Sequence, residues 1–190
     1  MSFENAWTQF HLGEPPIGWM LLGEGAANRL RFHSLPASKR YADTDEERSL
    51  LLGRQNVLAF EVLGDRPCWL VQAHWVLQPG ERDVADQHDP FRATREWKLD
   101  FAFEILEDDG EEGRPWRVHA AQARWAPGRF DDLLLSIADE KAGPTLWMGT
   151  DGAIFAPYDG GVDLFLPGAE AVQRLAAQHP DWLPTHPLNL

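Results

Sequence analysis

Residues 145–167 read TLWMGTDGAIFAPYDGGVDLFLP, three short apolar segments separated by two glycine-containing turns. The turns fall at residues 149–152 (GTDG) and 158–161 (YDGG). Glycine adopts the positive φ angles that tight reversals need, and the segments between the turns are too short for helices and rich in β-forming residues. We therefore expect a β-meander that forms much of a sheet, with the rest of the chain packed around it.

The order of the other expected elements indicates the fold class. We expect strands at 28–35, 68–77, 95–106 and 116–125, and helices at about 44–63, 130–139 and 170–178. Thr44 and Glu47 form a capping-box pattern at the start of the first of these helices. Because strands come in consecutive runs, the sequence favours an α+β fold with a mainly antiparallel sheet and helices packed on one face. The length fits a single domain over residues 1–190.

Two of the expected strands alternate clearly between apolar and polar residues, which is typical of a sheet with one solvated face. The apolar faces are Trp69, Val71, Ala73, Trp75 and Leu77 in the first strand, and Trp97, Leu99, Phe101, Phe103 and Ile105 in the second. Gln72 and His74 lie on the polar face of the first strand. We therefore place Trp69, Trp75 and Trp97 in the core.

Four further tryptophans, Trp7, Trp19, Trp147 and Trp182, follow no such pattern. A tryptophan among them that is exposed would mark a contact surface, because this residue type contributes strongly to binding interfaces.

The chain carries a strong negative charge. There are 30 Asp and Glu residues against 17 Lys and Arg, which gives a formal net charge of −13. This charge repels the phosphate backbone of nucleic acids and anionic membrane surfaces, so the sequence predicts neither as a partner. It permits a basic protein partner, although an acidic surface that keeps the protein in solution is the simpler explanation.

Cysteine content and hydropathy indicate the compartment. Cys68 is the single cysteine, so the chain forms no intramolecular disulfide, and we expect Cys68 to be a small buried core residue. The first 30 residues show no charged segment followed by an apolar core, and no apolar run approaches the ~20 residues of a membrane span. These features predict a cytoplasmic protein.

The search for chemistry gives no catalytic motif and no cofactor fingerprint. The best candidates for a site are the aspartates of the meander, Asp151, Asp159 and Asp163. We expect them mainly to stabilise turns, and the alternative is that their oxygens hold a hard cation. Tyr158 and Asp159 also place a phenol and a carboxylate together at a bend, where they can meet a ligand.

Two histidines form a second candidate. His74 and His119 share the polar face of the sheet if their strands are neighbours. Such a face is either an ordinary solvated surface or a shallow binding surface.

Three segments resemble an uncharacterised bacterial family of unknown function. They are W-x-P-G-x-F-D at 125–131, P-Y-D-G-G-x-D at 157–163 and D-W-L-x-x-H-P at 181–187, and residues 34–41 also resemble that family. The resemblance covers about two thirds of the chain. It implies a bacterial cytoplasmic protein and brings no activity with it.

Taken together, these features predict a non-enzymatic cytoplasmic interaction or inhibitor-like protein whose acidic surface binds a basic partner. The alternatives are a metal-dependent hydrolase that uses the turn aspartates and a homo-oligomeric structural protein joined through tryptophans or a sheet edge. The oligomeric state stays open. The candidate binding residues are Tyr158, Asp159, Asp163, His74 and His119, and no catalytic residue, metal ligand or cofactor is predicted.

Overall fold

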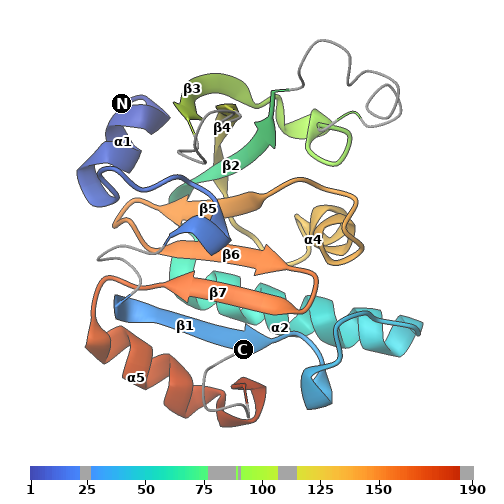
Figure 1. Ribbon diagram of the computed structural model, residues 1–190. Coiled ribbons are helices and arrows are strands. Elements are labelled where there is room, and N and C mark those ends of the chain that lie inside the picture. The colour runs from blue at the N-terminus through green and yellow to red at the C-terminus, as the bar shows by residue number, and fades with distance from the viewer. Residues whose placement is uncertain (22–26, 77–88, 90, 107–114, 185–190) are drawn as a thin grey trace.

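The meander lies inside a larger sheet. The computed structural model describes residues 1–21, 27–76, 89, 91–106 and 115–184. In these residues seven strands form one antiparallel sheet in the order β1-β7-β6-β5-β2-β4-β3 (Figure 1). The predicted meander is confirmed as the adjacent strands β5 (Thr145–Gly149), β6 (Ile154–Tyr158) and β7 (Gly161–Phe165).

The remaining elements flank the meander in space. The other strands are β1 (Arg29–His33), β2 (Pro67–Trp75), β3 (Asp100–Leu106) and β4 (Pro115–Arg124). The described helices are α1 (Phe3–Phe10), α2 (Asp45–Leu63), α4 (Asp131–Ala138) and α5 (Ala169–Gln178). Short 3-10 turns occur at Gly18–Met20, Pro36–Ser38, Arg95–Trp97 and Pro180–Trp182. None of the helices in the described residues is long and apolar enough to cross a membrane.

The two turns of the meander need glycine for different reasons. Gly152 has a φ angle of 82°, as the sequence predicts for a tight reversal. In the second turn neither Gly160 nor Gly161 has a positive φ, which corrects that expectation. A Cβ atom at Gly161 would instead overlap the carbonyl oxygen of Phe32 on the neighbouring strand β1. Glycine is required there because two backbones approach closely.

The larger part of the core lies between the sheet and the helices α2, α4 and α5. Trp125 and Phe130 pack there with ring centroids 5.0 Å apart, and Trp147 and Phe155 extend the aromatic cluster from β5 and β6. These side chains are fully or almost fully buried. The predicted α+β fold with an antiparallel sheet is confirmed.

The opposite face of the sheet carries α1. Phe3 and Trp7, one helical turn apart, are buried against this face together with Val71, Met148 and Ile154. Helices therefore pack on both faces, although the three that contribute to the larger cluster share one. Figure 1 shows α1 beside one end of the sheet, with the short turn Gly18–Met20 in front of β5 and β6.

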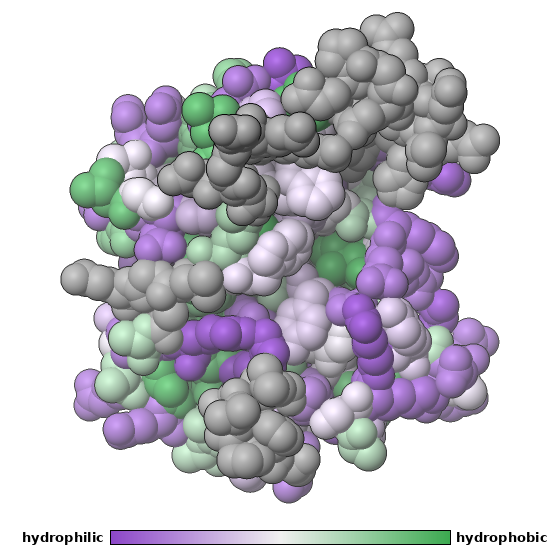
Figure 2. Space-filling model, in the orientation of Figure 1, coloured by the Kyte–Doolittle hydropathy of each residue, from purple (hydrophilic) through white to green (hydrophobic). Residues whose placement is uncertain are grey.

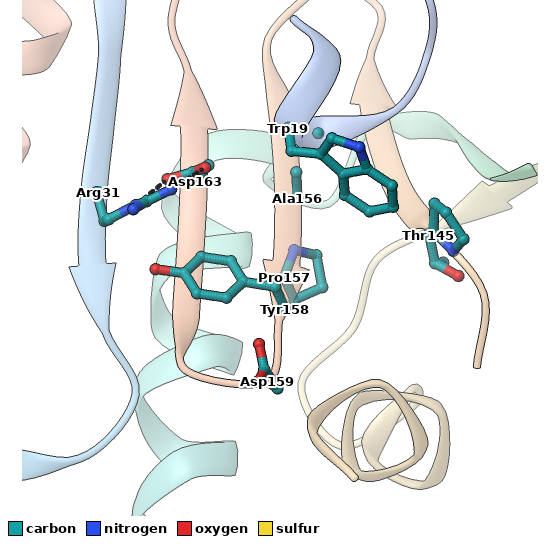
Figure 3. Close-up of a pocket in the computed structure, with 10 residues that line it drawn as sticks. Trp19, Arg31, Thr145, Ala156, Pro157, Tyr158, Asp159 and Asp163 are labelled. Carbon is teal, nitrogen blue, oxygen red and sulfur yellow. Dashed lines mark hydrogen bonds and ion pairs between the residues drawn. The ribbon is translucent and has the colours of Figure 1, made fainter. Parts of the chain in front are cut away.

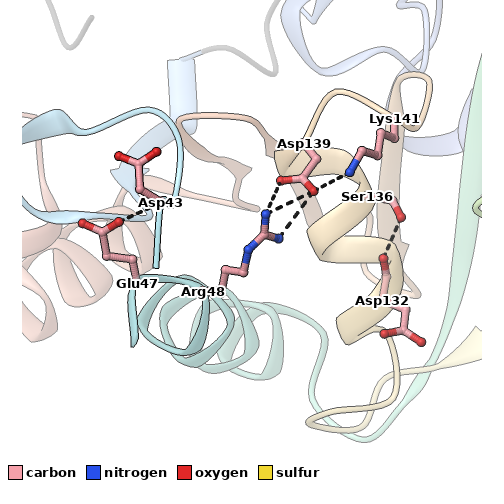
Figure 4. Close-up of polar contacts among 7 residues, drawn as sticks. All are labelled: Asp43, Glu47, Arg48, Asp132, Ser136, Asp139 and Lys141. Atoms are coloured by element: carbon pink, nitrogen blue, oxygen red, sulfur yellow. Dashed lines mark hydrogen bonds and ion pairs between the residues drawn. The ribbon is translucent and has the colours of Figure 1, made fainter. Parts of the chain in front are cut away.

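Helix α2 begins as its sequence predicts. The Thr44 hydroxyl accepts a hydrogen bond from the Glu47 backbone N–H at 3.2 Å, and the Glu47 carboxylate accepts one from the Asp43 N–H at 2.8 Å. Arg48 on the next turn pairs with Asp139 at the end of α4, with 3.2 Å between the charged atoms (Figure 4). The two helices are thus joined at their polar edges.

The strand predicted at 95–106 is shorter in the structure. Residues 95–97 form a 3-10 turn, Lys98 has a φ of 47°, and β3 starts at Asp100. A β-bulge between Phe101 and Phe103 then reverses the side-chain phase. Phe101 consequently contacts His119 on the face that carries α2, α4 and α5, and its side chain is 57% exposed. Phe103 instead stacks on Phe3 on the face that carries α1. The prediction that both belong to one inward face is wrong.

The alternation predicted for β2 also fails, at Trp75 and at Gln72. Trp75, predicted as core, is 49% exposed because it lies at the end of the strand, where Trp116 covers one side of its ring. Gln72, predicted on the solvated face, is fully buried, since the Thr94 hydroxyl covers it and donates a hydrogen bond to its Oε1 at 2.6 Å. Leu77 lies outside the described residues.

Candidate functional site

Two adjoining hollows form a groove on the face of the sheet that carries α1. Their volumes are about 250 and 220 Å³. They share Trp19, Pro144, Thr145, Pro157, Tyr158 and Asp159, and we call them together the Trp19 groove. Figure 2 shows this face with hydrophobic and weakly polar residues at its middle, bordered by strongly hydrophilic residues.

Strand register brings the polar groups of the groove together. Arg31 on β1 lies opposite Asp163 on β7, and Asp163 lies opposite Ala156 on β6. Residues directly opposite each other in neighbouring strands project from the same face of a sheet. Tyr158, two residues after Ala156, therefore projects from this face as well.

At the inner end of the groove, the Asp163 carboxylate binds two arginines, of which Arg31 lines the groove. Asp163 is nearly buried and accepts hydrogen bonds from Arg31 at 2.8 and 3.0 Å and from Arg29 at 2.7 Å. The hydrogen bond to Asp163 is the main cause that raises the pKa of Arg31. A buried aspartate in an otherwise apolar strand is thus compensated by two guanidinium groups.

Tyr158 forms the wall next to this ion pair. Its ring lies under the Arg31 guanidinium, with 5.1 Å from the guanidinium carbon to the ring centroid. In Figure 3 the phenol points toward the Arg31–Asp163 pair. Burial raises the pKa of Tyr158 to about 12, so the phenol keeps its proton at neutral pH. Tyr158 can donate a hydrogen bond to a ligand but cannot act there as a base.

The outer end of the groove is acidic. Asp159, in the turn between β6 and β7, pairs with Nε of Arg40, and Glu140, just after α4, pairs with Nη2 of Arg40 at 3.3 Å. Glu140 also accepts a hydrogen bond from the Tyr41 hydroxyl at 3.0 Å. Two carboxylates therefore share one cation among the described residues, which leaves an excess negative charge at this end.

Trp19 is the exposed aromatic residue of the groove. Its side chain is 59% exposed and lies over β6 and β5, between Ala156 and Thr145 in Figure 3. The turn that carries it approaches the sheet closely, because a Cβ atom at Gly18 would lie 3.1 Å from the Cβ of Ala156. Of the four tryptophans without a sequence pattern, Trp7 and Trp147 are buried and Trp182 is half-buried.

The three candidate aspartates do not gather into one site. Asp159 and Asp163 line the Trp19 groove, but Asp151 lies in the first turn of the meander, where it pairs with Arg66 at 3.0 Å. Asp151 also accepts a hydrogen bond from the Ala153 N–H, the turn-stabilising role that we expected. In the described part of the chain, no three His, Cys, Asp or Glu side chains are placed to hold a metal ion.

His74 and His119 lie together, away from the groove. Their strands β2 and β4 pair, and their ring centroids are 5.0 Å apart on the face that carries α4. Phe91 packs edge-on against both rings, at 4.9 and 4.7 Å. Burial lowers the pKa of both histidines, that of His74 to about 4. Both are neutral at pH 7 and act as packing groups in this structure.

Cys68 is buried, as the sequence predicts. Burial raises the pKa of its thiol to about 11, so the nucleophilic thiolate is a minor form at neutral pH.

The sequence pointed to Tyr158, Asp159 and Asp163 but missed their partners. Arg31 looked like a solvent-facing residue of a half-buried strand, and Glu140 carried no signal. One signal was present: Asp163 stands between Val162 and Leu164 as the only polar residue of its strand, and such an aspartate needs a buried cationic partner.

Comparisons with known proteins place the chain in a family without giving it an activity. A family model described as "Domain of unknown function (DUF3885)" matches residues 20–187, which include every residue of the Trp19 groove except Gly18 and Trp19. No curated protein and no solved structure matches the chain.

Proposed function

We propose that this chain, which belongs to the DUF3885 family of domains of unknown function, is a non-enzymatic protein that binds a basic segment of a partner protein in the Trp19 groove. The observation that carries the proposal is the outer end of the groove, where Asp159 and Glu140 share Arg40 beside the exposed indole of Trp19. An exposed aromatic face next to excess carboxylate is a favourable environment for an arginine or lysine side chain.

The whole molecule favours the same partner. A net charge of −13 attracts basic proteins over long distances and accelerates their association. Once the partner has arrived, burial of an aromatic anchor such as Trp19 contributes most of the affinity. The net charge therefore favours association with basic proteins, and the groove supplies most of the binding affinity.

The groups that line the groove are suited to binding more than to reaction. Its aspartates are paired with arginines, and Tyr158 retains its proton at neutral pH. A general base or nucleophile needs the opposite, an accessible group with a pKa near the working pH. These contacts weigh against the metal-dependent hydrolase.

We also propose that the protein is cytoplasmic and bacterial. The location is supported by a single buried cysteine and no disulfide among the described residues, and the origin by the resemblance of the three family segments.

Selection of peptides from a random displayed library tests the proposal. We expect retained peptides to be enriched in arginine and lysine next to apolar residues, and Trp19→Ala to weaken their binding at least tenfold. Trp75→Ala is the matched control, because Trp75 is similarly exposed but lies outside the groove, and it should leave binding unchanged. Retention of neutral or acidic peptides, or equal binding by the Trp19→Ala variant, would contradict the proposal.

A homo-oligomer is the second candidate, and the edge strand β3 favours it. Phe101 and Leu106 on this strand are 57% and 77% exposed, and an edge strand presents unpaired backbone groups. Light scattering of the purified protein distinguishes the two: a dimer that dissociates on Leu106→Lys supports self-association through β3. A monomer at all concentrations removes this candidate.

A further inference from the structure

Arg40 already occupies the acidic end of the Trp19 groove. Its Nε contacts Asp159, its Nη2 lies 3.3 Å from Glu140, and its guanidinium carbon lies 5.2 Å from the Tyr41 ring centroid. Its side chain is nevertheless 59% exposed. The guanidinium thus bridges two carboxylates from different elements while remaining accessible from solvent.

The segment that carries Arg40 has an unfavourable backbone conformation. Ala37 and Ser38 have φ angles of 53° and 57°, in the left-handed region that residues with a Cβ rarely adopt. Neighbouring contacts hold the segment: Lys39 pairs with Glu47 at 2.6 Å, and the Ser38 hydroxyl lies 3.2 Å from Nε2 of His33. Strained backbone of this kind persists where surrounding structure fixes it, and it is concentrated at functional sites.

Glu140, which pairs with Arg40 from the other side, also has an unfavourable backbone conformation. Helix α4 ends in a Schellman motif, with hydrogen bonds from Lys141 N–H to the Ser136 carbonyl and from Glu140 N–H to the Ile137 carbonyl. The residue at the Glu140 position of this motif is usually glycine, because its φ is positive. Here φ is 56° and the residue is glutamate. Glutamate at this position costs backbone strain but supplies the carboxylate that pairs with Arg40.

Three of the four non-glycine residues with positive φ in the described part of the chain thus flank the Arg40 contact. We infer that Arg40 is an internal stand-in for the ligand, and that an arginine side chain of the partner binds Asp159 and Glu140 by displacing it. This inference rests on the proposed function. Arginine fits better than lysine because a planar guanidinium can donate to two separated carboxylates at once, as Arg40 does.

Titration with N-acetyl-arginine N-methylamide, followed through the Trp19 indole N–H signal in NMR spectra, tests the inference. We expect Arg40→Ala to bind this probe at least fivefold more tightly than the unaltered protein, since the subsite is then empty. Arg66→Ala is the matched control, because Arg66 is an exposed arginine that pairs with the other meander turn, and it should bind as the unaltered protein does. The citrulline analogue, which has the same shape without the charge, should not bind to Arg40→Ala, and the lysine analogue should bind at least threefold more weakly than the arginine probe.

A second variant separates binding from folding. Glu140→Gly places the preferred residue in the Schellman position, so we expect the Arg40→Ala/Glu140→Gly protein to melt at a higher temperature than Arg40→Ala and to lose the tight binding. The inference is overturned if Arg40→Ala binds no more tightly than the unaltered protein, if citrulline binds equally well, or if Glu140→Gly leaves the probe bound. If library peptides bind the unaltered protein and Arg40→Ala equally, displacement fails and the proposed function stands. If no basic probe binds either protein, both fail.

Discussion

The two halves of the sheet, β1-β7-β6-β5 (the buried half) and β2-β4-β3 (the exposed half), are built differently. In β5 and β7 every residue is buried. Helices cover one face of both strands, and on the other face Arg29 and Arg31 cover Asp163 of β7. In β3, at the far edge, no residue is buried, and a bulge reverses the side-chain phase. The buried half holds the groove, and the exposed half holds the bulge. A polar site inside a buried sheet therefore needs the compensating charges that Asp163 and its two arginines supply.

The largest expected difference between the halves is the loss of stability when a phenylalanine is truncated to alanine. Phe155→Ala on β6 should lower the free energy of unfolding by about 3–5 kcal/mol, because it removes a fully buried ring from the aromatic cluster. Phe101→Ala on β3 should cost less than about 1 kcal/mol, since that ring is mostly exposed. Urea denaturation of both variants measures the contrast, and equal losses would contradict it.

The next effect concerns the close approach of β7 to β1. Gly161→Ala should lower the free energy of unfolding by about 3 kcal/mol, because the added Cβ overlaps the Phe32 carbonyl and forces the strands apart. Gly53→Ala is a control of opposite sign: this glycine lies on the exposed side of α2 with open space around it, so alanine should stabilise by about 0.5–1 kcal/mol. Destabilisation by both changes would show that the Phe32 contact is not the cause.

Breaking an ion pair should likewise cost more stability in the buried half than in the exposed half. Asp163→Asn should cost about 2–3 kcal/mol, since it leaves Arg29 and Arg31 partly buried without their carboxylate. The pair of Arg117 and Glu104 between β4 and β3 is about half exposed, so Glu104→Gln should change stability by less than about 0.5 kcal/mol. Thermal or urea unfolding of the two variants gives the comparison, and a Glu104→Gln loss as large as that of Asp163→Asn would refute it.

The effect that is smallest at neutral pH is a pH dependence from the histidine pair in the exposed half. Burial lowers the pKa of His74 from 6.5 to about 4, so the unfolded chain binds this proton more readily than the folded chain does. His74 therefore contributes full stability above pH 6.5, and this contribution is lost as the pH falls from 6.5 toward 4. Unfolding measured at several pH values should show a smaller slope in this window for His74→Gln, and an unchanged slope would exclude His74 as its source.

Local signals predicted the buried half well. The turns at 149–152 and 158–161 set the register of three consecutive strands, and Thr44 with Glu47 marked the start of α2. These predictions depended on residues close in sequence. For the same reason Tyr158 and Asp159 could be proposed as site residues from their turn alone.

Contacts distant in sequence were not predictable from one chain. Arg31 meets Asp163 because β1 pairs with β7, and Glu140 meets Arg40 because α4 ends beside the β6–β7 turn. At the other end, alternation placed Phe101 and Trp75 in the core because a pattern of period two shows neither a bulge nor the end of a strand.

Chemical-shift mapping of the labelled protein with a basic peptide selected from the library tests the central claim most directly. We predict that the largest shifts occur at Trp19, at residues 156–159 and at Glu140, with little change along β3. Shifts concentrated on β3, or spread evenly over the acidic surface without a maximum at the groove, would contradict the account.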